Sequence, residues 1–94
     1  MNLGLNQKVS LAEDVLIQEL SGESVLLNID SEQYFGLDEV GSRMLSVLTE
    51  SDSIQAANDI LLQEYEVEPA QLEQDLLELI EKCVKHGLVK VTQA

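Results

Sequence analysis

Apolar and polar residues alternate in three short runs along the first half of the chain. The runs cover residues 14–20, 25–30 and 33–37. Alternation predicts β-strands, because successive side chains of a strand point to opposite faces of the sheet. Gly22 lies in the turn between the first two runs and can adopt a positive φ. The pattern therefore predicts a three-stranded antiparallel meander with one face available for burial.

The second half of the chain changes to a helical period, with apolar residues three and four positions apart. Asp38 suits the N-cap of a first helix, and Pro69 suits the first turn of a third. Gly87 is a suitable C-terminal cap for that third helix. The helices are expected over residues 38–48, 53–65 and 69–86, before a short extended tail. The order predicts an α+β, winged helix-turn-helix-like fold, a three-stranded antiparallel sheet followed by three helices.

A chain of 94 residues is long enough for a single domain with one core. Residues 1–13 show no clear period, so we expect a loosely ordered N-terminal lead-in before one domain over 14–94. The N-terminus lacks the apolar run of a signal peptide, and no stretch approaches the roughly 20 apolar residues of a membrane span. The single cysteine, Cys83, cannot form an internal disulfide. These features predict a cytoplasmic protein.

Acidic residues greatly outnumber basic ones, 18 against 5, which gives a formal net charge of −13. Such a surface repels phosphate backbones and anionic lipid, so neither nucleic acid nor a membrane is an expected partner. A DNA-binding winged helix would read bases with the start of its third helix. That segment, residues 69–75, contains two acids and no base, which argues against DNA binding.

Cys83 and His86 lie three positions apart on the third helix and suggest a catalytic or metal site. One Cys and one His cannot complete a zinc site, and no nucleophile–base constellation accompanies them. We therefore expect no catalytic residue, no metal and no cofactor, and a protein that is not an enzyme.

The third strand is expected to be an edge, with main-chain groups left unpaired. Its sequence contains neither Lys nor Pro, and Gly36 leaves room for another backbone. On the third helix, the apolar band from Leu77 to Leu79 spans roughly 160°, against about 100° for an ordinary core-facing stripe. Packing against both the second helix and the sheet could use this whole band. Alternatively, one edge of it lines a groove for an extended peptide that joins the sheet as a strand.

The segment VLLNIDSEQYFGLDEVGSRMLSVL, residues 25–48, resembles the signature region of PqqD-like proteins, the RiPP recognition elements. It is most similar to the free-standing leader-binding proteins of lasso-peptide pathways. The resemblance is good over about residues 14–50, and over 53–91 only the layout of helices before GLV matches. It implies a winged helix-turn-helix-like fold that does no chemistry and binds the leader of a ribosomally made precursor peptide.

In that family the leader lies antiparallel along the third strand, and its apolar anchors enter the cleft beside the third helix. The resemblance thus implies strand contacts at Gln33, Tyr34, Phe35 and Gly36. It implies cleft contacts at Leu76, Leu79, Ile80 and Cys83. From the strand pattern, Phe35 is expected in the core and Tyr34 on the peptide side.

The resemblance also implies partners. In lasso pathways the leader is delivered to a leader-cleaving cysteine peptidase, with a macrocyclising synthetase downstream; in the PqqD branch the partner is a radical SAM enzyme. A further alternative is an acyl-carrier-like acidic protein, because residues 29–31 resemble the prosthetic-group serine motif. That serine should open a helix, whereas Ser31 is expected between two strands.

Overall fold

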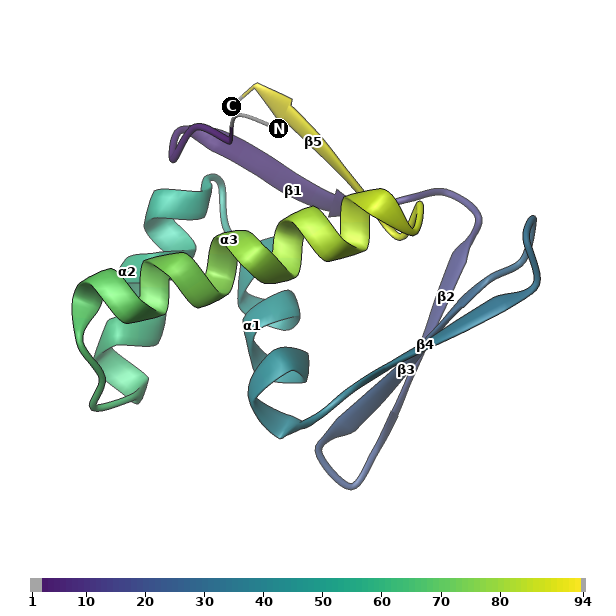
Figure 1. Ribbon diagram of the computed structural model, residues 1–94, viewed down its shortest axis with the longest axis horizontal. Coiled ribbons are helices and arrows are strands. Elements are labelled where there is room, and N and C mark those ends of the chain that lie inside the picture. Colours follow the sequence, from purple (N-terminus) through teal and green to yellow (C-terminus); the bar gives the residue numbers. More distant parts are fainter. Residues whose placement is uncertain (1–2, 94) are drawn as a thin grey trace.

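The computed structural model describes residues 3–93, and Figure 1 shows their arrangement. The elements are β1 (Gln7–Leu11), β2 (Val15–Leu20), β3 (Glu23–Asn28), β4 (Gln33–Leu37), α1 (Glu39–Glu50), α2 (Ile54–Glu64), α3 (Pro69–Lys85) and β5 (Val89–Gln93). The α+β class and the predicted order of three strands followed by three helices are confirmed. None of the helices in the described part is long and apolar enough to cross a membrane.

Strands β2, β3 and β4 form the predicted antiparallel meander, with β3 in the middle. The β2–β3 turn places Ser21 at φ 54° and Gly22 at φ 85°. Two successive positive φ angles define the tight turn that best matches the twist of a hairpin. Along the next pairing, Leu26 lies opposite Phe35 and Leu27 opposite Tyr34. Side chains of Leu26 and Phe35 therefore share the inner face, and those of Leu27 and Tyr34 share the outer face.

Strands β1 and β5 pair antiparallel and form a second, two-stranded sheet. The prediction of a loosely ordered lead-in over residues 1–13 is therefore wrong for residues 7–11; residues 1 and 2 lie outside the described part. Val9 is 1% exposed and pairs with Val91 at the opposite end of the chain. A pairing between the two ends leaves no local signal in the sequence, which is why the residues around Val9 did not predict a strand.

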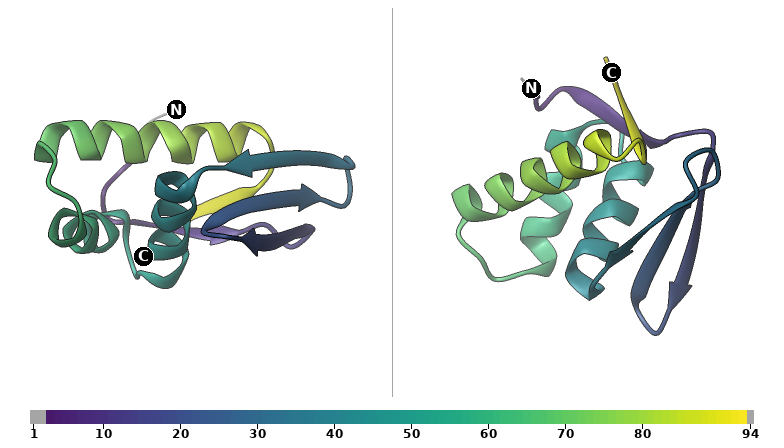
Figure 2. Two further views of the ribbon diagram at one scale, coloured as in Figure 1. Left: turned by 90° about the horizontal axis from the view of Figure 1, so that it is seen from below. Right: turned by 45° about the vertical axis from the view of Figure 1, so that its right-hand side comes forward.

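Helix α1 lies in the middle of the molecule, between α2, the β2–β4 sheet and the β1–β5 ribbon (Figure 2). It begins as predicted at Asp38, whose carboxylate accepts a hydrogen bond of 2.8 Å from Gly41 N–H. The core is built from fully buried side chains of both sheets and all three helices. The largest of these are Val9, Leu26, Leu45, Leu48, Ile54, Leu61, Leu76, Ile80, Cys83 and Leu88.

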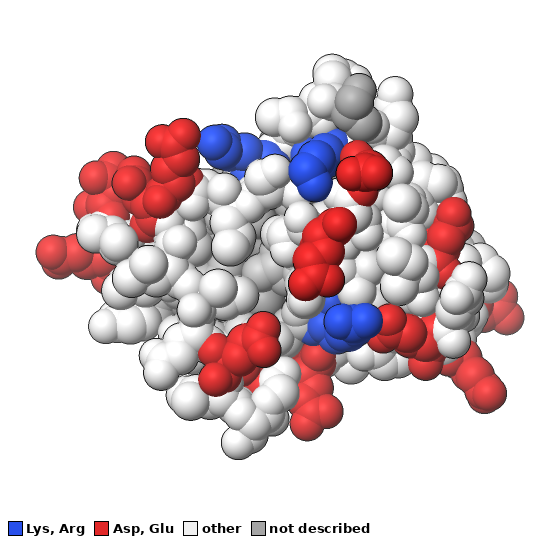
Figure 3. All heavy atoms as spheres, turned by 180° about the vertical axis from the view of Figure 1, so that it is seen from behind, with Lys and Arg blue, Asp and Glu red and all other residues white. Residues whose placement is uncertain are grey.

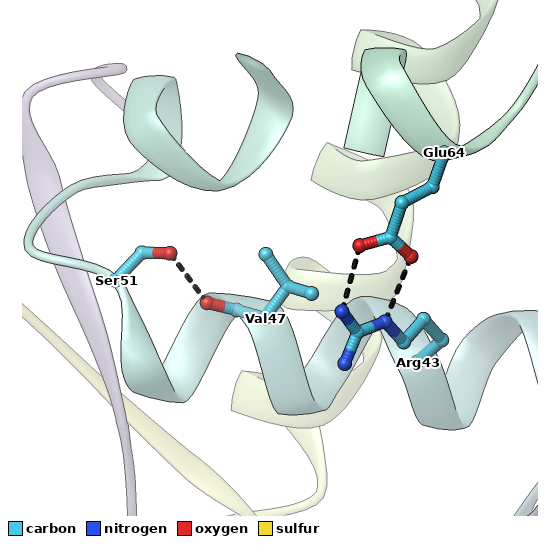
Figure 4. Close-up of polar contacts among 4 residues, drawn as sticks. All are labelled: Arg43, Val47, Ser51 and Glu64. Carbon is cyan, nitrogen blue, oxygen red and sulfur yellow. Dashed lines mark hydrogen bonds and ion pairs between the residues drawn. The ribbon is translucent and has the colours of Figure 1, made fainter. Parts of the chain in front are cut away.

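Figure 4 shows two polar contacts of α1, one with α2 and one at its own C-terminal end. The Arg43 guanidinium donates two hydrogen bonds, of 2.8 and 2.7 Å, to the carboxylate of Glu64 on α2. The hydrogen bond to Arg43 lowers the pKa of Glu64, and the same contact raises the pKa of Arg43. At the C-terminal end of α1, the Ser51 hydroxyl donates to the Val47 carbonyl oxygen at 2.6 Å. The first contact joins α1 to α2, and the second closes the last turn of α1.

The thiol of Cys83 belongs to the core, where it is 1% exposed and unpaired. Burial raises its pKa to about 11, because the interior disfavours the charged thiolate. A protonated, inaccessible thiol is a poor nucleophile. Cys83 therefore acts as a small apolar side chain.

The burial of Val9 in the β1–β5 ribbon predicts that shortening its side chain destabilises the fold. We expect Val9→Ala to lower the free energy of unfolding by about 2 kcal/mol, through lost apolar burial and the cavity that remains. Val67→Ala removes the same atoms from a side chain that is 45% exposed and is the matched control. Urea denaturation of both variants checks this. Equal stability of the two would show that β1 is not part of the core.

The burial of Cys83 predicts its reactivity. At pH 8 the native protein should react with a disulfide reagent such as DTNB far more slowly than the same protein in denaturant, because the thiolate fraction and the access are both small. Raising the pH toward the pKa of about 11 should speed the native reaction. Rapid stoichiometric labelling of the folded protein at pH 8 would contradict this.

Candidate functional site: the edge of strand β4

The backbone groups of β4 alternate between β3 and an open edge. Ile29 N–H donates to Asp14 O at 2.8 Å, so position 29 of the hairpin faces β2. Because backbone direction alternates along a strand, the even-numbered residues of β3 face β4. Their register partners on β4 are Gln33, Phe35 and Leu37. Tyr34 and Gly36 therefore direct their N–H and C=O groups away from the sheet, toward the open edge.

Strand β4 is an outer strand of the β2–β3–β4 sheet, so its far side carries no further strand. The outer face is open at Gly36 too, where an added Cβ atom would meet no heavy atom within 4 Å. The Tyr34 side chain is 74% exposed and lies on the outer face of the sheet. Neither β4 nor its flanking residues in the described part carries Lys or Pro to block an incoming strand. The predicted open edge is therefore present in the structure.

The sheet has a second edge, at β2, which differs in its surroundings. There Val15 N–H already donates to Ala12 O at 3.2 Å. At the β4 edge, by contrast, the end of α3 lies against Phe35. The β4 edge thus combines free main-chain groups with a groove that α3 borders.

The groove lies between β4 and the C-terminal end of α3. The rings of Phe35 and His86 have centroids 5.2 Å apart, and Lys82 Nζ lies 5.4 Å from the Phe35 centroid. A cavity of about 470 Å³ opens here. It is lined by Gln33, Tyr34, Phe35, His86 and Leu88. An added strand on β4 would place alternate side chains on the face of the sheet that this cavity borders.

Asn28 positions the two walls of the groove. Its Oδ1 accepts hydrogen bonds from the backbone N–H groups of Asp30 and Ser31, at 3.0 and 3.1 Å, in the β3–β4 turn. Its Nδ2 donates to Gly87 O at 3.2 Å, just past the end of α3. Gly87 adopts φ 69°, which ends the helix as predicted. One amide therefore ties the β4 hairpin to α3.

The strand residues predicted for the site all lie at the β4 edge or groove. Gln33 and Tyr34 are exposed, and Gly36 is open to solvent. Phe35 is half-buried, since it packs on the core and also borders the groove. Tyr34 instead points to the outer face, so its backbone contributes more to the edge than its ring does.

Three of the four predicted cleft residues lie in the core instead. Leu76, Ile80 and Cys83 are 0%, 1% and 1% exposed, and peptide contact with them would require the core to open. The wide apolar band of α3 is used by α2 and by β5, and the latter was expected only as an extended tail. Leu79 is only half-buried, so it remains a candidate for contact with a peptide.

Sequence reasoning missed Lys82 and His86 as groove residues, and it missed Asn28 altogether. The helix dipole alone is enough to explain two basic residues at the end of a helix. Their spacing held a further signal, because Leu79, Lys82 and His86 follow one another at three and four positions and share one helix face. The role of Asn28 depends on a contact 59 positions away, which no local pattern reveals.

The structure also bears on the acyl-carrier and metal-site interpretations. Ser31 lies in the β3–β4 turn and opens no helix, so the acyl-carrier interpretation loses its structural basis. Within residues 3–93, no group of three or more His, Cys, Asp or Glu side chains could hold a metal ion.

Comparison with known proteins gives a family and two similar structures. Residues 23–89 match the family described as Coenzyme PQQ synthesis protein D (PqqD). A structure described as TbiB1 in complex with the TbiA(beta) leader peptide is 31% identical, with a TM-score of 0.81 over 86% of this chain and 94% of that chain. Lasso peptide synthetase B1 complexed with the leader peptide is 23% identical and has a TM-score of 0.80, over 88% and 98% of the two chains. The search of curated protein sequences gave no match.

The family match begins with β3, covers β4 and all three helices, and ends at the start of β5. It thus includes both walls of the groove and more than half of the chain. The likeness to TbiB1 extends over most of both chains, and the second structure supports the same fold. The chain therefore belongs to the PqqD family.

Proposed function

We propose that the protein recognises the leader region of a ribosomally synthesised precursor peptide and performs no chemistry itself. The leader lies antiparallel along β4, as a fourth strand, with alternate side chains over the groove beside α3. The observation that carries this proposal is the open edge at Tyr34 and Gly36, whose main-chain groups lie beside a groove instead of another strand. The similar TbiB1 structure, which contains a leader peptide, supports it.

The proposed contacts follow the geometry. Tyr34 and Gly36 provide main-chain hydrogen bonds, and Gln33 and Phe35 contact side chains of the guest. Leu79 is the proposed cleft contact on α3. The buried residues Leu76, Ile80 and Cys83, which the family resemblance implied as contacts, are not among the proposed contacts because they belong to the core.

The bound leader is delivered to a maturation enzyme. The similarity to TbiB1, solved with a leader peptide, and to a lasso peptide synthetase B1 favours the leader peptidase of a lasso pathway as the partner. The second candidate for the partner is a radical SAM enzyme, which the resemblance implies for the PqqD branch of the family. The free thiol of Cys83 agrees with a reducing compartment, and we place the protein in the cytoplasm.

A display selection from a random peptide library tests leader-like binding without choosing a leader sequence in advance. We expect the folded protein to enrich peptides that bind in an extended conformation, since Tyr34 and Gly36 offer free main-chain groups at the edge of β4. In the ¹⁵N-labelled protein, an enriched peptide should shift the amide resonances of residues 33–37. Those of α2, on the far side of the core, should stay in place.

Two outcomes would reject the proposal. One is a selection that enriches no peptide above a heat-unfolded control. The other is a set of enriched peptides that bind at saturation without moving the amides of residues 33–37.

Removal of one main-chain donor should weaken binding. Gly36→Pro deletes the N–H that faces the open edge, a position where an edge strand tolerates proline. The loss of one hydrogen bond and the bulk of the ring should raise the Kd of a selected peptide by about tenfold or more. Gly36→Ala keeps the N–H and adds a methyl group to open space, so it is the matched control.

Circular dichroism should show both variants folded, and isothermal titration calorimetry measures the two affinities. An unchanged Kd for folded Gly36→Pro would mean that the guest does not pair with β4.

A further inference from the structure

Most positive charges of the chain are already engaged within the fold. Arg43 pairs with Glu64 at 2.7 Å, and Lys90 pairs with Glu13 at 3.6 Å. Lys8 Nζ donates to the Ser51 carbonyl oxygen at 2.7 Å, just past the end of α1. Each of these three side chains thus already has a partner within the fold.

The remaining two lysines lie at the end of α3, and Lys82 lies beside the groove. No ion pair is present for Lys82 or Lys85 within residues 3–93. Glu78 precedes Lys82 by four positions and is the usual partner in a helix. Its carboxylate instead accepts a hydrogen bond from Gln74 Nε2 at 3.2 Å, and Lys82 Nζ lies over the Phe35 ring. The Lys82 ammonium is thus left without a carboxylate at the groove wall.

The rest of the surface repels an acidic ligand. With a net charge of −13, the protein repels anions at long range, and acidic side chains are spread over the face seen in Figure 3. A carboxylate on a bound peptide is therefore favoured at the groove wall, where Lys82 and His86 flank Phe35. Elsewhere along the peptide, acidic residues lower the affinity.

We propose that the groove selects a peptide with one acidic side chain, placed between Lys82 and His86 when the peptide pairs with β4. This inference rests on the proposed function and names the chemistry of the ligand. The position on the guest is set by strand geometry, because residues directly opposite each other in an antiparallel pair place their side chains on the same face. The guest residue opposite Phe35 therefore points its carboxylate toward Lys82 and His86. Its neighbours two positions away, opposite Gln33 and Leu37, point to the same side.

A charge exchange tests the inference. The wild type and Lys82→Glu are each used to select from the same random library of extended 14-residue peptides. We expect wild-type peptides to carry Asp or Glu at one fixed position relative to their apolar residues, and Lys82→Glu to enrich Lys or Arg there. Replacing the acidic residue of a selected peptide by Gln or Asn should weaken binding to the wild type by about tenfold. The same replacement should strengthen binding to Lys82→Glu, because it removes a repulsion between two carboxylates.

Lys90→Glu is the matched control, because it changes the net charge equally at a site on β5 away from the groove. It should select the same acidic peptides as the wild type. If it behaves like Lys82→Glu, the preference reflects overall charge and the inference is wrong.

The results separate the inference from the function on which it rests. Peptides that shift the amides of residues 33–37 but carry no acid at a fixed position reject the acidic preference and leave leader recognition in place. A selection that yields no peptide, or only peptides that leave those amides unmoved, rejects both.

Discussion

The site depends on one side chain, Asn28, which holds the β4 hairpin and the end of α3 in a fixed relation. Its amide accepts two hydrogen bonds from the β3–β4 turn and donates one to Gly87. An edge strand alone binds any extended chain weakly and without preference. With α3 held beside it, the same edge acquires side-chain positions that are ordered before the guest arrives, so less conformational entropy is lost on binding.

Much of the fold was predictable because its signals are local. The period of apolar residues indicated the β2–β4 meander and the three helices, and Asp38, Pro69 and Gly87 mark helix ends where expected. The β1–β5 ribbon escaped prediction, since its strands are separated by almost the whole chain. A five-residue strand with one buried side chain, Val9, resembles an unstructured segment until its partner is known.

Of the two walls of the groove, the β4 edge could be predicted from the sequence and the α3 wall could not. The open edge could be inferred because the last strand of a meander is an outer strand, and the absence of Lys and Pro supported it. The other wall could not, because a wide apolar band on a helix does not say which neighbours will cover it. The β5 strand covers part of the α3 band that was expected to face a peptide, and Lys82 and His86 border the groove instead.

The β1–β5 ribbon has a consequence for how the domain can be joined to others. Gln7 and Gln93 face each other at the end of the ribbon that points away from the β2–β4 sheet (Figure 1). A catalytic module attached by a linker before β1 or after β5 would start from nearly the same place, and neither linker would cross β4. Such tethering turns the encounter between a captured peptide and the enzyme into an intramolecular event, at a millimolar-scale effective concentration for a short linker.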